Sequence, residues 1–539
     1  MAASASSPSF PPSSRERLAL ILLSFGAVAV VLAAAPYKAF DLDRYFVSKE
    51  LVLNVSALLA ILLLFWQQRR AAMTRVDLLL SGFLLASLVS AAFAINYWAA
   101  QRALAISFSG VALFWAASAI RRAGLVRPLL IALATGVVVG TATCLAQAYG
   151  YVSEYFSLNR SPGGTFGNRN FVAHLAAVGT PIVVLVALTA RTGIGALLGG
   201  LGMAIVSAAL VLSRSRAAWL AVIVLAVPVG GIAFLTRARW REPRTARRLV
   251  VLGATVAVGG LLALVLPNRL EWKSDSPYLD SAVGLVNYKQ GSGRGRLVQY
   301  TNSLRMTRAH PVFGVGPGNW PVVYPKYASR NDPSLSQDEG LTSNPWPSSD
   351  WVAFLSERGV IGFGLLLAAM FGLLGRAVRD IGGRDSRDPE GVLTAIALVG
   401  TLAATAVVGA FDAVLLLGLP AFFFWTLAGA LVPPAKSDAR ISKAAKIGAG
   451  VMLVVVSIGV LRSATQLAAM GVYSSSTRLS ALEQSASLDP GNYRIRMRLA
   501  QAYVARGDCT RARAQARAAR DLFPNAGEPK RILAACGAR

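Results

Sequence analysis

Three arginine-rich stretches in this sequence have the residue types and spacing of an anion-binding site. They read NRSPGGTFGNRN from Asn159, SRSRAAW from Ser213 and GSGRGRL from Gly291. Guanidinium groups form bidentate, charge-assisted hydrogen bonds with phosphate oxygens, and they stabilise negative charge that develops on a departing phosphate. The sequence therefore predicts an anion site built from arginines of these stretches, namely Arg160, Arg169, Arg214, Arg216, Arg294 and Arg296.

Each stretch also has a purely structural interpretation, which the sequence leaves open. The first could be a re-entry turn capped by Asn170. The arginines of the second could reach lipid phosphates by snorkelling, and the third could be the solvated start of an amphipathic helix.

Long apolar runs must position these stretches. Of the 539 residues, 55% are hydrophobic and 15% charged, as in polytopic membrane proteins. About thirteen runs are long enough to span a hydrocarbon core of about 30 Å. They begin near Leu18, Leu51, Leu78, Leu104, Pro128, Phe171, Gly195, Ala217, Leu249, Trp351, Val392, Ala413 and Ile447. The predicted fold is all-α, a membrane protein with about 13 transmembrane helices.

Basic residues between the runs predict the orientation of the chain. They cluster after the second, fourth, eighth, tenth and twelfth runs, as Arg69, Arg70 and Arg75 do after the second. Because cytoplasmic loops carry the excess of Lys and Arg, we expect a cytoplasmic N-terminus and an outward position for all three stretches. The predicted parts are a disordered cytoplasmic tail, nine helices, a large periplasmic loop, four helices and a periplasmic helical domain; their residues are 1–16, 17–266, 267–350, 351–463 and 464–539.

Composition also argues against several classes of partner. The net charge of +28 comes mostly from clusters between apolar runs, where topology and anionic lipid headgroups account for it, so we expect no nucleic-acid partner. With three cysteines and two histidines, neither a disulfide framework nor a zinc centre organises the fold. We expect no metal and no cofactor.

The C-terminal domain has the spacing of a tetratricopeptide repeat, through Leu499, Ala500, Tyr503, Gly507, Ala512, Ala519 and Pro524. One and a half repeats bury little surface, so we expect the domain to pack on the large loop or on a protein partner. Cys509 and Cys536 lie in it, and they could form a disulfide or remain two unpaired buried thiols.

Taken in order, the motifs GTFGNRNFVA, SRAAW, GRL, HPVFGVGPGN and ERGVIG resemble those of the O-antigen ligase and polymerase family of membrane glycosyltransferases, over roughly residues 18 to 435. The resemblance implies a GT-C-like helical transferase at the outer face of the bacterial inner membrane. Such an enzyme transfers glycan from undecaprenyl pyrophosphate to a lipid or glycan acceptor. The residues that match the family's pyrophosphate-binding arginines are Arg216 and Arg296, with Arg160 as a further candidate.

One position departs from the family pattern. Members commonly have a histidine, the usual candidate for general base, where this chain has Ser348. The nearest titratable substitute is Asp350, which could instead cap the tenth helix, and Asp338 and Glu339 lie further up the loop.

The two histidines are weaker candidates for chemistry. His310 could bind substrate, although its place before a glycine turn favours a role in loop structure. For His174, inside a predicted helix near its outer end, we expect a helix–helix hydrogen bond.

Several functions remain open at this stage. The resemblance does not separate a ligase from a polymerase or from a protein O-oligosaccharyltransferase. A transporter of an anionic lipid or glycan would show more intramembrane polar residues and repeated halves. A catalytically inactive assembly scaffold is a further alternative, because Ser348 replaces the expected base.

Overall fold

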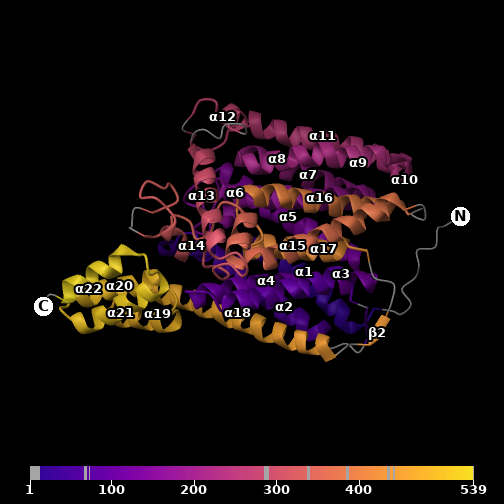
Figure 1. Ribbon diagram of the computed structural model, residues 1–539. Coiled ribbons are helices and arrows are strands. Elements are labelled where there is room, and N and C mark those ends of the chain that lie inside the picture. The colour runs from indigo at the N-terminus through magenta and orange to yellow at the C-terminus, as the bar shows by residue number, and fades with distance from the viewer. Residues whose placement is uncertain are drawn as a thin grey trace.

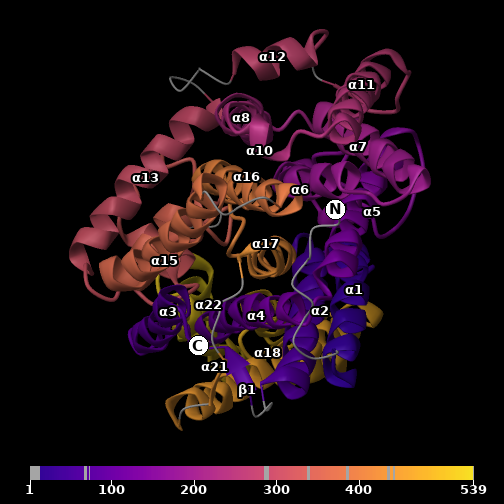
Figure 2. The same ribbon diagram turned by 90° about the vertical axis from the view of Figure 1, so that its right-hand side faces the viewer.

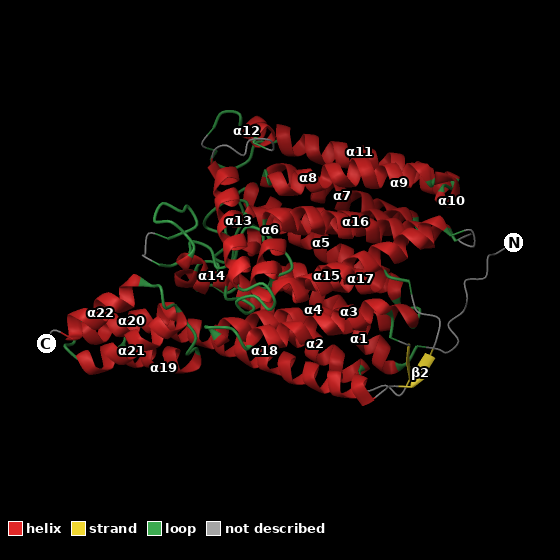
Figure 3. Ribbon diagram, in the orientation of Figure 1, coloured by secondary structure: helices red, strands yellow, loops and turns green. Residues whose placement is uncertain are grey.

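The computed structural model describes residues 12–65, 69–71, 73–272, 274–284, 291–336, 340–383, 388–433, 438–440 and 443–537. Long helices run side by side in a bundle, and a small group of helices projects from one end of it (Figure 1). Loops gather at that same end, near α13 and α14 (Figure 3). The prediction of an all-helical membrane fold is confirmed.

The bundle is built from apolar helices. They are α1 (Ser14–Leu32), α2 (Asp43–Leu64), α3 (Arg75–Ala91), α4 (Tyr97–Arg122), α5 (Val126–Ala148), α6 (Arg169–Leu188), α7 (Gly193–Ser213), α8 (Arg216–Val224), α9 (Gly230–Leu235), α11 (Pro243–Val265), α15 (Asp350–Gly382), α16 (Pro389–Phe411), α17 (Gly418–Leu431) and α18 (Lys443–Ser475). A π-helical turn, η3 (Leu225–Val229), joins α8 to α9 at Pro228. Among the described residues, ten helices are long and apolar enough to cross a membrane.

The remaining predicted runs correspond to α1, α3 and α17, which pack among those ten helices. Local signals explain where α1 and α3 begin: Ser13 with Glu16, and Thr74 with Asp77, form capping boxes. The run expected from Ala413 becomes helical only at Gly418. Its first residues form a loop, because the Asp350 carboxylate accepts hydrogen bonds from their backbone N–H groups.

Two basic connections meet at the end of the bundle opposite the projecting helices. The strand β1 (Arg69–Ala71) pairs antiparallel with β2 (Asp438–Arg440), with Arg70 opposite Ala439. This ribbon lies at the far end from α19 to α22 (Figure 1). Both segments had been assigned by charge to the same side of the membrane, and their pairing agrees with that assignment.

The other end of the bundle is covered by α13 (Gly291–Ala309), which runs across the ends of the apolar helices (Figure 1). Viewed along the bundle, α13 lies outside α15 and α16 (Figure 2). It packs over a small core that includes Met306 and Trp320. The short elements are η1 (Lys38–Phe40), η2 (Gly164–Phe166), α10 (Arg237–Trp240), α12 (Pro277–Val283), α14 (Trp320–Val323) and η4 (Tyr324–Lys326).

A buried ion pair fixes the large loop to the bundle. Glu357 and Arg358 lie in α15, just before a kink at Gly359, where φ is 65°. The Glu357 carboxylate accepts hydrogen bonds from the backbone N–H groups of Gly318 at 2.8 Å and Trp320 at 3.2 Å. Arg358 Nη1 lies 3.4 Å from Glu357, and its other nitrogens donate to serine hydroxyls of α3 and α4. The ERGVIG motif therefore has a structural role.

The C-terminal repeat consists of α19 (Leu479–Leu488), α20 (Tyr493–Val504), α21 (Cys509–Leu522) and α22 (Gly527–Gly537). It packs on the large loop, as predicted: Asn525 Nδ2 donates to the carbonyl of Val322 at 3.1 Å. Asn96, at the start of α4, donates to the carbonyl of Leu522 at 3.4 Å. Below the repeat, Arg462 of α18 forms a buried ion pair with Asp489.

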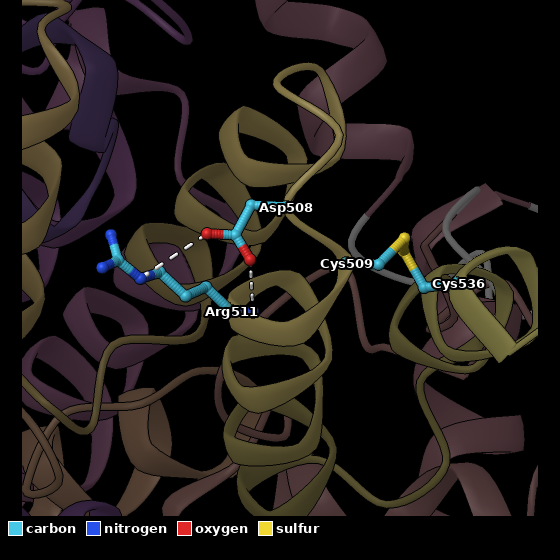
Figure 4. The surroundings of a disulfide bond; sticks show 4 residues. All are labelled: Asp508, Cys509, Arg511 and Cys536. Atoms are coloured by element: carbon cyan, nitrogen blue, oxygen red, sulfur yellow. Dashed lines mark hydrogen bonds and ion pairs between the residues drawn. A yellow bond between two sulfur atoms is a disulfide. The ribbon is translucent and has the colours of Figure 1, made fainter. Parts of the chain in front are cut away.

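Cys509, at the start of α21, and Cys536, near the end of α22, form a disulfide (Figure 4). Next to it, Asp508 accepts a hydrogen bond from the backbone N–H of Arg511 at 3.0 Å and so caps α21. The third cysteine, Cys144, is buried and its thiol contacts the carbonyl of Pro162. Of the two alternatives left open by the sequence, the disulfide is the one that the structure contains.

We predict that Cys509→Ser lowers the free energy of unfolding of the repeat by about 3 kcal/mol, because the bond closes a loop of 27 residues. Limited trypsin digestion of the purified protein measures this as faster cleavage within residues 479–537. Reductant should accelerate cleavage of the wild type and leave Cys509→Ser unaffected. Equal cleavage of reduced and oxidised wild type would contradict the prediction.

Candidate active site

Four arginines line a pocket of about 630 Å³ at the covered end of the bundle. Three of them, Arg160, Arg169 and Arg214, belong to the first two predicted stretches. The fourth, Arg269, was missed by the sequence reasoning. It follows the ninth apolar run on the predicted outer face, so a basic residue on the side where few are expected was the signal that could have found it. The other lining residues are Ser161, Leu270, Glu271, Trp272, Ser274 and Asp280.

Helix ends and tight turns present these arginines. Arg169 is the first residue of α6, and Arg214 ends α7 in a left-handed conformation with φ of 53°. Arg160, in the loop before α6, has φ of 54°. Apart from Asp41, these two are the described non-glycine residues with positive φ. Such conformations cost of order 1–2 kcal/mol and cluster at functional sites.

Positive charge exceeds negative charge in the pocket, since four arginines face two carboxylates, Glu271 and Asp280. The Trp272 ring lies between two of the cations, with its centroid 4.3 Å from Arg214 Cζ and 5.5 Å from Arg169 Cζ. Partial burial lowers the pKa of the Arg214 guanidinium, and the charge of Arg216 lowers it further, although Asp280 opposes this. An arginine remains charged at neutral pH, so a bound anion would relieve the repulsion.

Buried cations of α2 hold the loop that carries Arg160. Arg44 donates to the backbone carbonyls of Glu154 at 2.9 Å and Phe156 at 3.0 Å. Lys49 donates to the carbonyl of Thr165 at 2.8 Å, inside the GTF segment. These positioning residues were also missed. Their signal was the dense charge of the segment DRYFVSKE at the start of an apolar run.

The remaining predicted arginines lie outside the pocket lining. Arg216 Nη1 donates to the carbonyl of Gly284, at the end of α12, at 2.9 Å. Arg294 is exposed. Arg296 lies over Phe411, 6.0 Å from the ring centroid, and its buried Nε has no hydrogen-bond partner. The structure thus brings arginines of the first two stretches together in the pocket and leaves Arg216, Arg294 and Arg296 outside its lining.

Asp350 is not placed for proton transfer. Its side chain has no exposed surface, and its two oxygens accept hydrogen bonds from the backbone N–H groups of Val414 at 2.9 Å and Leu415 at 2.8 Å. It does not cap the tenth helix either, because Ser349 is the N-cap residue of α15. Its position in the sequence suggested a base, but burial and the loop before α17 give it a structural role.

The structure places the other candidates around position 348, and His310, as follows. Ser348 donates its backbone N–H to Gln299 Oε1 at 2.6 Å, which ties it to α13. Asp338 and Glu339 lie outside the described residues. His310 is exposed just beyond the last turn of α13, about 21 Å along the helix axis from Arg296. Its carbonyl accepts the N–H of Gly314, so it shapes the loop.

His174 does not form the expected helix–helix hydrogen bond. It is 1% exposed, and neither ring nitrogen has a hydrogen-bond partner. The nearest charged group is the Asp412 carboxylate, with Oδ2 3.9 Å from Nε2. This distance is too long for a hydrogen bond.

Asp350→Asn should destabilise the protein by about 1–3 kcal/mol, because an amide NH₂ would face one of two backbone N–H donors. Thermal unfolding in detergent measures the loss as a lower Tm. A variant with the wild-type Tm and a shifted pH profile of activity would show instead that Asp350 titrates during the reaction.

Two segments of the chain match known families. Residues 201–367 match the family model described as O-antigen ligase, and residues 479–536 match that of the tetratricopeptide repeat. No curated protein matches the chain.

The O-antigen ligase match runs from α7 into α15, so it contains Arg214, Arg216, Arg269, Arg294 and Arg296. It confirms the resemblance seen in the motifs and supports a membrane enzyme of the glycan ligase or polymerase type. The chain is therefore a polytopic membrane protein in which residues 201–367 are similar to the O-antigen ligase family and residues 479–536 to the tetratricopeptide repeat.

Proposed function

We propose that this protein transfers or polymerises glycan from undecaprenyl pyrophosphate onto a lipid or glycan acceptor, at the outer face of the bacterial inner membrane. The observation that carries the proposal is the pocket of Arg160, Arg169, Arg214 and Arg269. Its excess positive charge fits a pyrophosphate, and its place at the ends of membrane helices fits a substrate anchored in lipid.

In the proposed reaction, the acceptor hydroxyl attacks the anomeric carbon of the donor glycan. A new carbon–oxygen bond forms while the bond from that carbon to the pyrophosphate oxygen breaks, and the configuration inverts. The bonding electrons leave with the pyrophosphate. Arginines that are already oriented toward it stabilise this charge without reorganising during the reaction.

A second cavity supports a donor with a long lipid tail. It has a volume of about 1130 Å³ and lies between α6, α7, α8, α9, α11 and α16, with mostly apolar side chains around it. Leu210 and Val211 line it, and they precede Arg214 by about one helical turn, or roughly 5 Å along the axis. A pyrophosphate held by Arg214 would thus have space for an isoprenoid chain directly below it.

The proposed orientation places the repeat in the periplasm and the N-terminus in the cytoplasm. The Cys509–Cys536 disulfide supports this, because such bonds persist in oxidising compartments. The basic connections that form β1 and β2 lie at the opposite end, as the positive-inside rule requires. The repeat would also offer a surface for a protein partner.

Arg214→Ala and Arg160→Ala should each lower the transfer rate by about 10²- to 10³-fold, because each removes a donor to the leaving pyrophosphate. The assay uses purified protein with an undecaprenyl pyrophosphate-linked glycan and measures release of the lipid pyrophosphate with and without acceptors. Arg214→Lys should recover only part of the rate, because an ammonium cannot bind in a bidentate manner.

Arg308→Ala is the matched control, since this arginine is exposed near the far end of α13. It should keep wild-type turnover. Wild-type turnover in both pocket variants would refute the proposed site. Deleting the gene distinguishes the reaction types: surface glycans reduced to single-repeat caps indicate a lost polymerase, and accumulated lipid-linked polymer indicates a lost ligase.

A further inference from the structure

Three polar side chains from separate segments interact electrostatically without a hydrogen bond between them. They are His174 of α6, Asp412 directly after α16, and Arg296 of α13. Both ring nitrogens of His174 and the Nε of Arg296 are buried without hydrogen-bond partners. A buried polar atom without a partner costs about 1–3 kcal/mol, so these three atoms leave hydrogen-bonding capacity for a further polar group.

The cluster lies close to Ser348. The Tyr300 hydroxyl contacts the carbonyls of Ser348 and Ala410, each at 2.7 Å. Ser348 therefore lies near Ala410 at the end of α16, and Ala410 is two residues before Asp412. Tyr300 itself follows Arg296 by one helical turn of α13.

The spacing of the pair suits a hydroxyl group. His174 Nε2 and Asp412 Oδ2 are 3.9 Å apart, so a hydroxyl that donates its one proton to Nε2 leaves the carboxylate close enough to stabilise the imidazolium. Asp412 is 16% exposed, which leaves an approach to the pair, and its other oxygen is held by the N–H of Ala413 at 2.9 Å. His174 follows Arg169, a pocket residue, by five positions, or roughly 7 Å along α6.

We propose that His174 and Asp412 form the acid–base pair that deprotonates the acceptor hydroxyl, an inference that rests on the proposed transferase function. The hydroxyl proton moves to His174 Nε2 as the acceptor oxygen bonds to the anomeric carbon. The electrons of the broken bond leave on the pyrophosphate. The Asp412 carboxylate, 3.9 Å from Nε2, stabilises the imidazolium that forms.

The alternatives for this role are weaker among the described residues. Both oxygens of Asp350 are bound to backbone N–H groups, and His310 is exposed about 21 Å away along α13. Glu357 is bound to the loop of Gly318 and Trp320. In contrast, both ring nitrogens of His174 have no hydrogen-bond partner, and the Asp412 carboxylate lies 3.9 Å from Nε2.

The test compares His174→Gln and Asp412→Asn with Asp521→Asn, a control whose carboxylate is 74% exposed on α21. Each purified variant is assayed for lipid pyrophosphate release and for binding of the undecaprenyl pyrophosphate-linked glycan. His174→Gln should lower kcat by about 10²- to 10⁴-fold and keep the donor Kd within twofold. The control should match the wild type in both measurements.

The pH profile separates catalysis from a structural role. The rate of the wild type should fall at acidic pH as His174 becomes protonated, with Asp412 and Arg296 as the charged groups that face it. This acidic limb should disappear from the residual activity of His174→Gln. If that variant does not fold, Asp412→Asn decides the matter, because its partly exposed side chain can change with little effect on packing.

An active wild type with unchanged rate and acidic limb in His174→Gln, or with unchanged rate in Asp412→Asn, would overturn this inference and leave the proposed function standing. A wild type that neither binds nor cleaves the donor would instead overturn the proposed function.

Discussion

Buried charges that bind loop backbone are the interaction on which the loop-covered end of this protein depends. At the end of a membrane bundle, loops bring N–H and C=O groups to a depth where water is scarce, and each needs a partner. Glu357 supplies acceptors for the loop of Gly318 and Trp320, and Arg44 and Lys49 supply donors for the loop that carries Arg160. The apolar helices thus determine how deep the bundle lies in the membrane. These few charged residues determine the conformation of the loops that cover its end.

This division explains how much of the fold was predictable. Apolar length and charge clusters are local properties, so the helices and the grouping of basic connections could be read from the sequence. The start of α17 could not be, because it depends on Asp350, more than sixty residues earlier. The placement of Ser349 rather than Asp350 as N-cap is likewise a matter of which side chain the tertiary structure engages.

The candidate site was also predictable only where its residues carry a local signal in the sequence. Arg160, Arg169 and Arg214 stood out because cations on the predicted outer face oppose a topological rule, and the structure brings them into one pocket. Arg269 shared that signal but lacked a motif. The proximity of His174 to Asp412 had no signal at all, since these residues are separated by 238 positions and each has an ordinary local context. Only packing of α6 against α16 brings them together.

The contact between Asn525 and Val322 has a consequence for the order of biogenesis. The partners are 203 positions apart, so Val322 leaves the ribosome well before Asn525. The large loop therefore reaches the membrane surface well before the surface on which it docks has been made. If the repeat is exported as proposed, its disulfide can form only after it has crossed the membrane. The contact between the repeat and the large loop can then form only after the repeat has been exported.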